Sequence, residues 1–391
     1  MSMVILQILL FQRVIIFSAM VKQMKKPDYL MLIPALIILT FSACNDPVFY
    51  TISSEVPVIP AYIDGSPTNF VFFKDCVYVA SGSSLYRYSA GTDGHGTWSG
   101  QIPVSGGWIG SLAATSSWLY AICLENSTGI LMQSSDGTIW SKTPNVNYDV
   151  KAIFTTEENR LFFSANEGND FYDIYYLSGT PIKVLENVKE FRGAVFNNGT
   201  YFICTTDGIY QFGNFSDEPV ILQNSNGKNF VGIIDLGSDV AAIARNQELY
   251  SVSTGGIASI AKFDSRSASG ALTVFKDSHG RRLLLVGRMD LTYSTTSGYT
   301  FGYIEIELDD DGFKHGAVYR MPGENPSYST VDSNERFITT IGKNPVNHIF
   351  HVPSSLNYPD MSLIFASTQK NGVWSYRERG AIWQWNAEEE R

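Results

Sequence analysis

The sequence is built from a repeat of short apolar segments that recur about every 40 residues. Each copy starts with an apolar run such as "CVYVA", "RLFFSA" or "DVAAIA". A second run follows about ten residues later, in which an aliphatic residue usually precedes an aromatic one. The second run occurs as "SLYRYS" (Leu85), "GILMQS" (Ile130), "DIYYLS" (Ile174), "GIYQFG" (Ile209), "ELYSVS" (Leu249), "DLTYST" (Leu291) and "GVWSYR" (Val373). Gly, Asn, Asp and Ser separate the runs, and no long helical period appears past residue 65.

A repeat of this length with several short strands per copy is typical of β-propeller blades. One four-stranded sheet cannot bury both of its faces alone, whereas sheets arranged in a ring cover one another. We therefore predict an all-β chain with a seven-bladed β-propeller over residues 65–391. The wide interval between Leu291 and Val373 leaves six or eight blades as alternatives. Because innermost strands are crowded near the axis, we assign the small-residue segments "AAIA" and "SLAATS" to them.

Three turns add a resemblance to a known motif. "STTSGYTF" has the spacing of the Asp-box, S-x-D-x-G-x-T-W, with Thr in place of Asp, and "SSDGTIW" and "GTDGHGTW" are partial versions. The body therefore resembles a sialidase-like propeller with Asp-box (BNR-type) repeats, in which these residues are structural: they tie down a hairpin and pack an aromatic ring between sheets. The residues concerned are Asp93, Gly96 and Trp98; Ser134, Asp136, Gly137 and Trp140; and Ser294, Thr296, Gly298, Thr300 and Phe301.

The N-terminal segment "MKKPDYLMLIPALIILTFSAC" (24–44) has the order of a bacterial lipoprotein signal. Two lysines precede an apolar stretch from Tyr29 to Phe41, which is shorter than the ~20 residues that span a bilayer. Ser42 and Ala43 then precede Cys44, as in a lipobox, except that Phe41 replaces the usual Leu; spirochaete-type lipoproteins are looser there. An uncleaved helical anchor is the alternative.

We therefore expect residues 1–43 to be a signal peptide, helical in the precursor, with 1–23 an over-extended start ahead of Met24. Cys44 would carry a diacylglycerol thioether and an N-acyl chain such as palmitate, which together give stable membrane anchoring. Residues 44–64 would then be a lipidated tether or a strand that closes the ring. This places the protein in the cell envelope, outside the cytoplasm, on the periplasmic or surface face of a bacterial membrane.

The net charge of the chain limits the classes of partner that we expect it to bind. The chain has a net charge of −10, and loss of residues 1–43 removes four basic residues and one acidic residue, which leaves 24 basic and 37 acidic, a net of −13. An acidic body repels phosphate backbones, so we expect no nucleic-acid partner. Hydrophobic content of 44% is enough for a sizeable core.

A search for catalytic or metal-binding groups yields little. The sialidase resemblance implies three arginines, a Tyr–Glu nucleophile pair and an acidic residue, but only "YRMP" (319–322) echoes that family's arginine motif. His348 and His351 in "HIFH" would lie on opposite faces of a strand. Cys76, Cys123 and Cys204 lie in apolar runs and are expected to be buried. We identify no catalytic residue, metal site or cofactor.

The leading hypothesis is thus a non-catalytic binding or assembly module for a protein or glycan ligand at one face of the propeller. A glycan-active hydrolase of sialidase-like type is the alternative, and a scaffold within an envelope complex is a third. Turn-region aromatics are candidates for a binding platform or, alternatively, for packing between blades: Trp98, Trp108, Tyr148 and Tyr299.

Overall fold

The structure is a computed structural model, and it describes residues 62–90, 96–104, 107–166, 170–262, 268–276, 280–289, 302–310, 312–313, 319–320, 345–356, 362–379 and 382–387. All of these belong to one compact unit, Pro60–Arg391. The expected signal peptide and lipidation site lie outside the described residues.

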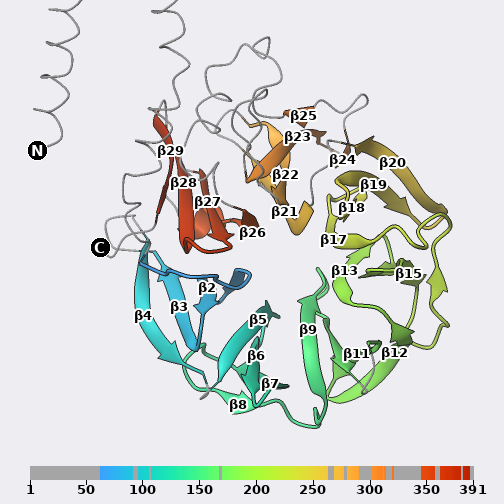
Figure 1. Ribbon diagram of the computed structural model, residues 1–391, viewed down its shortest axis with the longest axis horizontal. Helices are drawn as coiled ribbons and strands as arrows, with labels where there is room; N and C mark the ends of the chain where they lie inside the picture. Colours follow the sequence, from blue (N-terminus) through green and yellow to red (C-terminus); the bar gives the residue numbers. More distant parts are fainter. Residues whose placement is uncertain are drawn as a thin grey trace, which may run out of the picture. The chain divides into compact units, whose positions relative to one another are not determined.

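The described chain forms seven antiparallel sheets, each made of consecutive strands, and Figure 1 shows these sheets as the blades of a ring, coloured in chain order from blue to red. Blade 1 comprises β1 (Val71–Phe73), β2 (Cys76–Ser81), β3 (Ser84–Ser89) and β4 (Thr97–Pro103). Blade 2 comprises β5 (Trp108–Ala114), β6 (Leu119–Glu125), β7 (Thr128–Ser134) and β8 (Ser141–Lys142). Blade 3 comprises β9 (Asp149–Thr155), β10 (Leu161–Asn166), β11 (Tyr172–Ser178) and β12 (Thr180–Val188).

The other four blades repeat this order. Blade 4 comprises β13 (Phe191–Asn197), β14 (Thr200–Thr205), β15 (Ile209–Phe212) and β16 (Val220–Ile221). Blade 5 comprises β17 (Phe230–Asp235), β18 (Val240–Ala244), β19 (Glu248–Ser253) and β20 (Gly256–Lys262). Blade 6 comprises β21 (Ala268–Lys276), β22 (Arg282–Arg288), β23 (Tyr303–Asp309) and β24 (Gly312–Phe313), with β25 (Tyr319–Arg320) also paired to β23. Blade 7 comprises β26 (Val346–His351), β27 (Ser362–Thr368), β28 (Val373–Arg379) and β29 (Ile382–Ala387), with the 3-10 helix η3 (Ser354–Leu356) between β26 and β27. The all-β, seven-bladed prediction is confirmed.

The core consists of one apolar cluster at each junction between neighbouring blades. Seven such clusters occur in the described residues, and each takes its buried side chains from two adjacent sheets. The second strand of a blade serves two junctions at once: Val240, Ala242 and Ala244 of β18 face blade 4, whereas Ala241 and Ile243 face blade 6. Such a strand is buried on both faces, so it reads as a continuous apolar run.

This corrects the assignment of "AAIA" to an innermost strand. Those residues belong to β18, the second strand of blade 5, where small side chains fit because sheets cover both faces. "SLAATS", in contrast, contributes to β5, the first strand of blade 2. In blade 6, Leu291 lies outside the described residues, and the third strand is β23, which begins at Tyr303.

The ring closes between blades 7 and 1. Phe365 of β27 is fully buried there, and its ring lies 5.8 Å from that of Phe70, 4.9 Å from that of Tyr88 and 5.0 Å from that of Trp98. The chain ahead of blade 1 adds two backbone hydrogen bonds: the Gly372 and Val373 N–H groups donate to the carbonyls of Gly65 and Ile63. The segment 45–54, a candidate for ring closure, lies outside the described residues.

Removing the Phe365 ring is therefore expected to loosen the junction that closes the ring. We predict that Phe365→Ala lowers the free energy of unfolding by about 3–5 kcal/mol, the usual cost of truncating a fully buried Phe. Equilibrium urea unfolding followed by tryptophan fluorescence measures this cost. Phe72→Ala is the matched control, since Phe72 in blade 1 is 36% exposed. Equal losses in the two variants would contradict this account of the junction.

Candidate functional site

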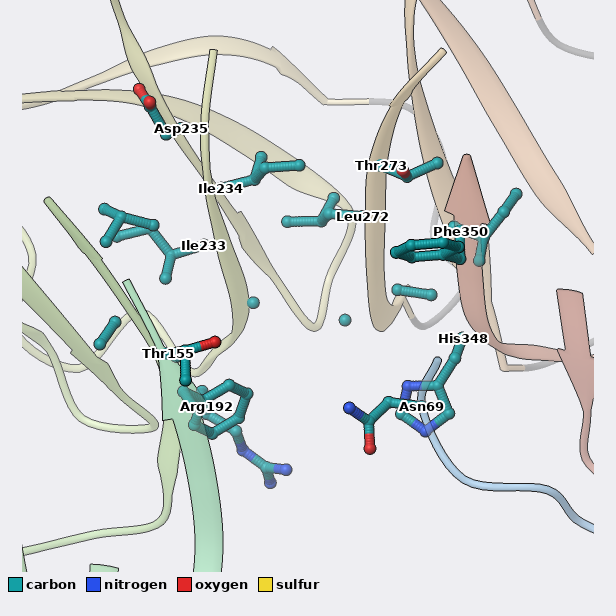
Figure 2. A pocket seen from close by; sticks show the side chains of 18 of the residues that line it. Asn69, Thr155, Arg192, Ile233, Ile234, Asp235, Leu272, Thr273, His348 and Phe350 are labelled. Carbon is teal, nitrogen blue, oxygen red and sulfur yellow. The ribbon is translucent and has the colours of Figure 1, made fainter. Parts of the chain in front are cut away.

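A cavity of about 360 Å³ lies in the central channel. Its walls come from the first strands of five blades, β9, β13, β17, β21 and β26, together with Asn69 and Phe70 just before β1. Figure 2 shows labelled side chains from these elements surrounding the cavity. The first strand of each blade is therefore the innermost strand, and the side chains that it turns toward the axis form the site.

The inner strands approach one another closely. A Cβ atom on Gly193 would lie 2.7 Å from Cγ2 of Ile233, and a Cβ on Gly232 would lie 2.6 Å from the carbonyl oxygen of Gly270. These neighbours occupy similar positions along β13, β17 and β21, as expected when the inner strands run in the same direction along the channel. Glycine is required here because a side chain would collide with the next blade.

A β-bulge recurs near the start of the inner strand. In blades 2 to 7 the pairing of the first strand with the second shifts register, and the extra residues are Gly110, Lys151, Arg192, Val231, a longer insertion at 269–271, and Asn347. Bulges bend a strand and redirect its side chains. After five of the bulges come Ser111, Ala152, Gly193, Gly232 and His348. His348 is thus the one large side chain in that set.

One end of the cavity carries a cation and neutral polar groups. Arg192 lines the wall; its Nε donates to Oγ1 of Thr206 at 3.3 Å and its Nη2 pairs with Glu190. Burial lowers the pKa of His348 to about 4, so this imidazole is neutral at neutral pH. Asn69 is committed to structure, because its Nδ2 donates to the carbonyl of Leu112 and its Oδ1 accepts from the Leu112 N–H.

The other end carries two carboxylates. Glu157, just after β9, accepts a 2.8 Å hydrogen bond from the N–H of Phe196, and Asp235, the last residue of β17, accepts one of 2.7 Å from Nδ2 of Asn197. Burial and, more weakly, the charge of Asp235 raise the pKa of Glu157, although the Phe196 N–H opposes them. The carboxylates therefore lie within electrostatic range of each other and also join blade 4 to its neighbours.

A Tyr–Glu pair of the kind that the sialidase resemblance implies does occur, but it is built into packing. The Tyr201 hydroxyl donates to Oε2 of Glu158 at 2.7 Å. Burial and the Glu158 carboxylate raise the pKa of Tyr201 to about 12, and its ring packs against Phe212 and Phe215. Tyr201 is buried and does not line the cavity, so it has no face open to a substrate and this pair is structural.

The turn between β7 and β8 makes the contacts that hold such a hairpin in place. Asp136 Oδ1 accepts from the N–H groups of Ile139 and Thr138, and these bonds hold the pKa of its carboxyl well below the usual range. Ser134 Oγ accepts from the Gly137 N–H at 2.8 Å. Gly137 has φ +79° and lies over the Tyr78 hydroxyl, so a larger residue would be strained. Trp140 packs at the junction of blades 1 and 2.

The remaining sequence candidates lie away from the cavity. Gly96 packs on the ring of Tyr88, and Trp98 and Tyr148 pack between blades. Trp108 is 68% exposed. His351 packs edge-to-face on Phe275, and Cys123 and Cys204 are buried, whereas Cys76 is only half-buried. Outside the described residues lie Cys44, Asp93, Ser294, Thr296, Gly298, Tyr299, Thr300 and Phe301.

The sequence reasoning missed Arg192, Glu157 and Asp235 as site residues. A signal was present: Glu190–Arg192 and Asp149–Lys151 each place an acid two residues before a base at the start of an inner strand. Charged residues inside such strands are otherwise few. The described residues contain no group of three His, Cys, Asp or Glu side chains placed to hold a metal ion. No helix in the described parts of the chain has the length and apolar character needed to cross a membrane.

Comparison with known proteins supports the fold alone. No family model matches the sequence, and no curated protein matches it. Among solved structures, a virginiamycin B lyase from Staphylococcus aureus superposes with a TM-score of 0.54 and 11% identity, over 82% of this chain and 98% of the lyase. An ancestral GH74 enzyme has a TM-score of 0.58 and 14% identity, and this chain matches 47% of it over 85% of its own length.

YCF48 bound to D1 peptide has a TM-score of 0.50 and 11% identity, over 82% of this chain and 94% of that chain. Enzymes and a peptide-bound protein thus share this architecture, and at these identities the likeness carries no function. The chain is a seven-bladed β-propeller similar to these structures.

Proposed function

We propose that this chain is a lipid-anchored, extracytoplasmic binding or assembly module that takes a protein or glycan ligand in the channel cavity without acting on it chemically. The observation that carries the proposal is the cavity itself, walled by residues from six of the seven blades. Its volume of about 360 Å³ is in the range of small-ligand sites, and its walls mix apolar side chains with a few charged groups. Such a site sits on a rigid scaffold because inner strands form most of its wall.

The charged groups in the cavity support binding rather than chemistry. Glu157 and Asp235 each accept a hydrogen bond from blade 4, and Asp235 also accepts one from the N–H of Gly237 at 3.0 Å. Arg192 is held by Glu190 and Thr206. Side chains fixed in this way are pre-organised to recognise a ligand, which lowers the entropy lost on binding.

A filled cavity is expected to abolish binding. We predict that Thr155→Trp, which places an indole in the cavity wall, removes all ligands that the full-length chain in detergent binds on a peptide array and a glycan array. Thr180→Trp is the matched control, because Thr180 is an exposed residue of β12, the outermost strand of the same blade. Array signals that survive unchanged in Thr155→Trp would place ligand binding elsewhere and contradict the proposal.

A glycan-active hydrolase is the second candidate, and one observation favours it. Glu157 has a raised pKa and lies within electrostatic range of Asp235, which is the pairing of an acid and a base that glycoside hydrolysis uses. The hydrogen bonds to blade 4 argue against the hydrolase. Glu157 and Asp235 both use a carboxylate oxygen to join neighbouring blades, and a catalytic role would have to leave these bonds intact. The binding proposal is therefore preferred.

The two candidates differ in a direct assay. We predict that the full-length chain releases no more reducing ends from a panel of neutral and acidic oligosaccharides than the Glu157→Gln/Asp235→Asn double variant does. The hydrolase would be the better assignment if the wild-type chain released reducing ends and either Glu157→Gln or Asp235→Asn alone lowered that activity about 100-fold. A loss of that size is typical for removal of a general acid or base.

The membrane anchor is proposed from the sequence signal at Cys44. Loss of the thiol removes the only atom to which the diacylglycerol can attach, so Cys44→Ser is expected to move the protein from the detergent phase to the aqueous phase of a Triton X-114 partition and to abolish labelling by a palmitate analogue. Cys76→Ser is the control, since Cys76 is a free cysteine of blade 1. Unchanged partitioning of Cys44→Ser would refute the anchor.

A further inference from the structure

The cavity is electrically polarised along the channel. Arg192 is the second residue of β13, whereas Asp235 is the last residue of β17 and Glu157 comes two residues after the end of β9. Because the inner strands run in the same direction, their starts and ends lie at opposite mouths. The five residue steps from Arg192 to Asn197, which binds Asp235, correspond to roughly 17 Å of extended strand. A cation and two carboxylates therefore lie at opposite ends of one cavity.

Neither of the two carboxylates forms an ion pair within the described residues, where the ion pairs join Lys151 to Asp149, Lys183 to Asp173 and Glu186, and Arg192 to Glu190. Arg282 lies nearby, but its Nη2 donates to the carbonyl of Leu236, next to Asp235, and not to the carboxylate. Glu157 and Asp235 are held only by neutral donors, namely N–H groups and the amide of Asn197. A ligand ammonium or guanidinium group would relieve the repulsion between the carboxylates of Glu157, which is exposed, and Asp235, which is half-buried.

At the other end, the guanidinium of Arg192 is already oriented. Thr206 holds Nε and Glu190 holds Nη2, and no hydrogen bond from Nη1 occurs within the described residues. Glu190 is the more solvent-exposed partner of that ion pair, and Arg192 also lines the cavity, so a ligand carboxylate would share the guanidinium with Glu190. A fixed, planar guanidinium is suited to a carboxylate of the ligand.

Between the two ends the wall is mostly apolar. Ile233 and Leu272 flank the middle of the cavity in Figure 2, whereas the side chains of Phe154 and Val195, which also line it, pack into the junctions on either side of blade 4. Thr273 adds a hydroxyl to this part of the wall. Aliphatic side chains of a ligand would bury area here, whereas most hydroxyl groups of a neutral sugar would lose water without gaining partners. The wall thus favours a ligand that has charges at its two ends and an apolar centre.

We infer that the cavity binds an extended peptide segment of about five residues, with a carboxylate at the Arg192 end, apolar side chains in the middle and a Lys or Arg side chain between Glu157 and Asp235. The inference rests on the proposed function and specifies the ligand class for that site. The roughly 17 Å between the charged ends accommodates about five residues at the extended rise of ~3.3 Å each.

The test uses four fluorescein-labelled peptides and the full-length chain in detergent. Their five-residue cores are Asp-Val-Leu-Val-Lys, the two versions with one charge replaced by Asn or Gln, and the neutral version, each flanked by Gly-Ser. By fluorescence anisotropy, we expect the doubly charged peptide to bind at least tenfold more tightly than the neutral one, with each singly charged peptide in between. This comparison needs only the wild-type protein.

Protein variants then assign each charge to one end. In Arg192→Gln the Asp of the peptide should lose its effect on affinity while the Lys keeps its own, and in Glu157→Gln/Asp235→Asn the pattern should reverse. Lys151→Gln is the matched control: Lys151 is the bulge residue of blade 3, pairs with an acid two residues before it as Arg192 does, and is not part of the cavity wall. It should leave all four affinities unchanged.

The outcomes separate this inference from the proposed function. Equal affinity for the charged and neutral peptides, removed by Thr155→Trp, would overturn the charge-based ligand class but leave the cavity as the binding site. Binding of oligosaccharides alone, also removed by Thr155→Trp, would do the same. Charge-dependent peptide binding that survives Thr155→Trp, or no binding of any peptide or oligosaccharide, would overturn both.

Discussion

Apolar packing between the faces of neighbouring sheets is the interaction on which the rest of this structure depends. Every blade has two apolar faces, and each face is covered only by the next blade, as the seven junction clusters show. A sheet of this kind is stable only in a closed ring, because an open array would leave its first and last faces in water. The junction around Phe365 therefore stabilises all seven blades and not only the two that it joins.

The same ring determines the chemistry of the channel. Inner strands must converge, so glycines such as Gly232 stand where backbones nearly touch, and a bulge near the start of each strand in blades 2 to 7 redirects the side chains beside it. Arg192 reaches the cavity from one of these bulges. Glu157 and Asp235 lie at the same end of the cavity because they follow or end the inner strands β9 and β17, which flank the inner strand of blade 4. The candidate site is thus assembled from blades that are far apart in the sequence.

The parts that sequence reasoning predicted well are those with a strong local signal. The second strands, such as β10 and β18, were found because burial on both faces makes them uninterrupted apolar runs. The position predicted for "AAIA" was wrong, because the segment lies in the second strand of blade 5 and not in the innermost strand. Small side chains indicate close packing but do not show which strand of the blade is closely packed. The third strand of blade 6 was missed because β23 begins at Tyr303, well after the expected position at Leu291. The cavity residues were missed because a single Arg, Glu or Asp in a loop or strand end looks like a solvated charge.

The sequence by itself predicted the fold class and the repeat, with seven as the leading number of blades, because the need to bury apolar runs at a fixed spacing has few solutions. It also contains the signal that predicts an anchor at Cys44, since lipidation is read from a linear motif. Only the tertiary structure decided which charged residues face one another. Arg192, Glu157 and Asp235 come from three neighbouring blades, and the packing of these blades against one another, which no local pattern encodes, brings the three residues to the two ends of one cavity.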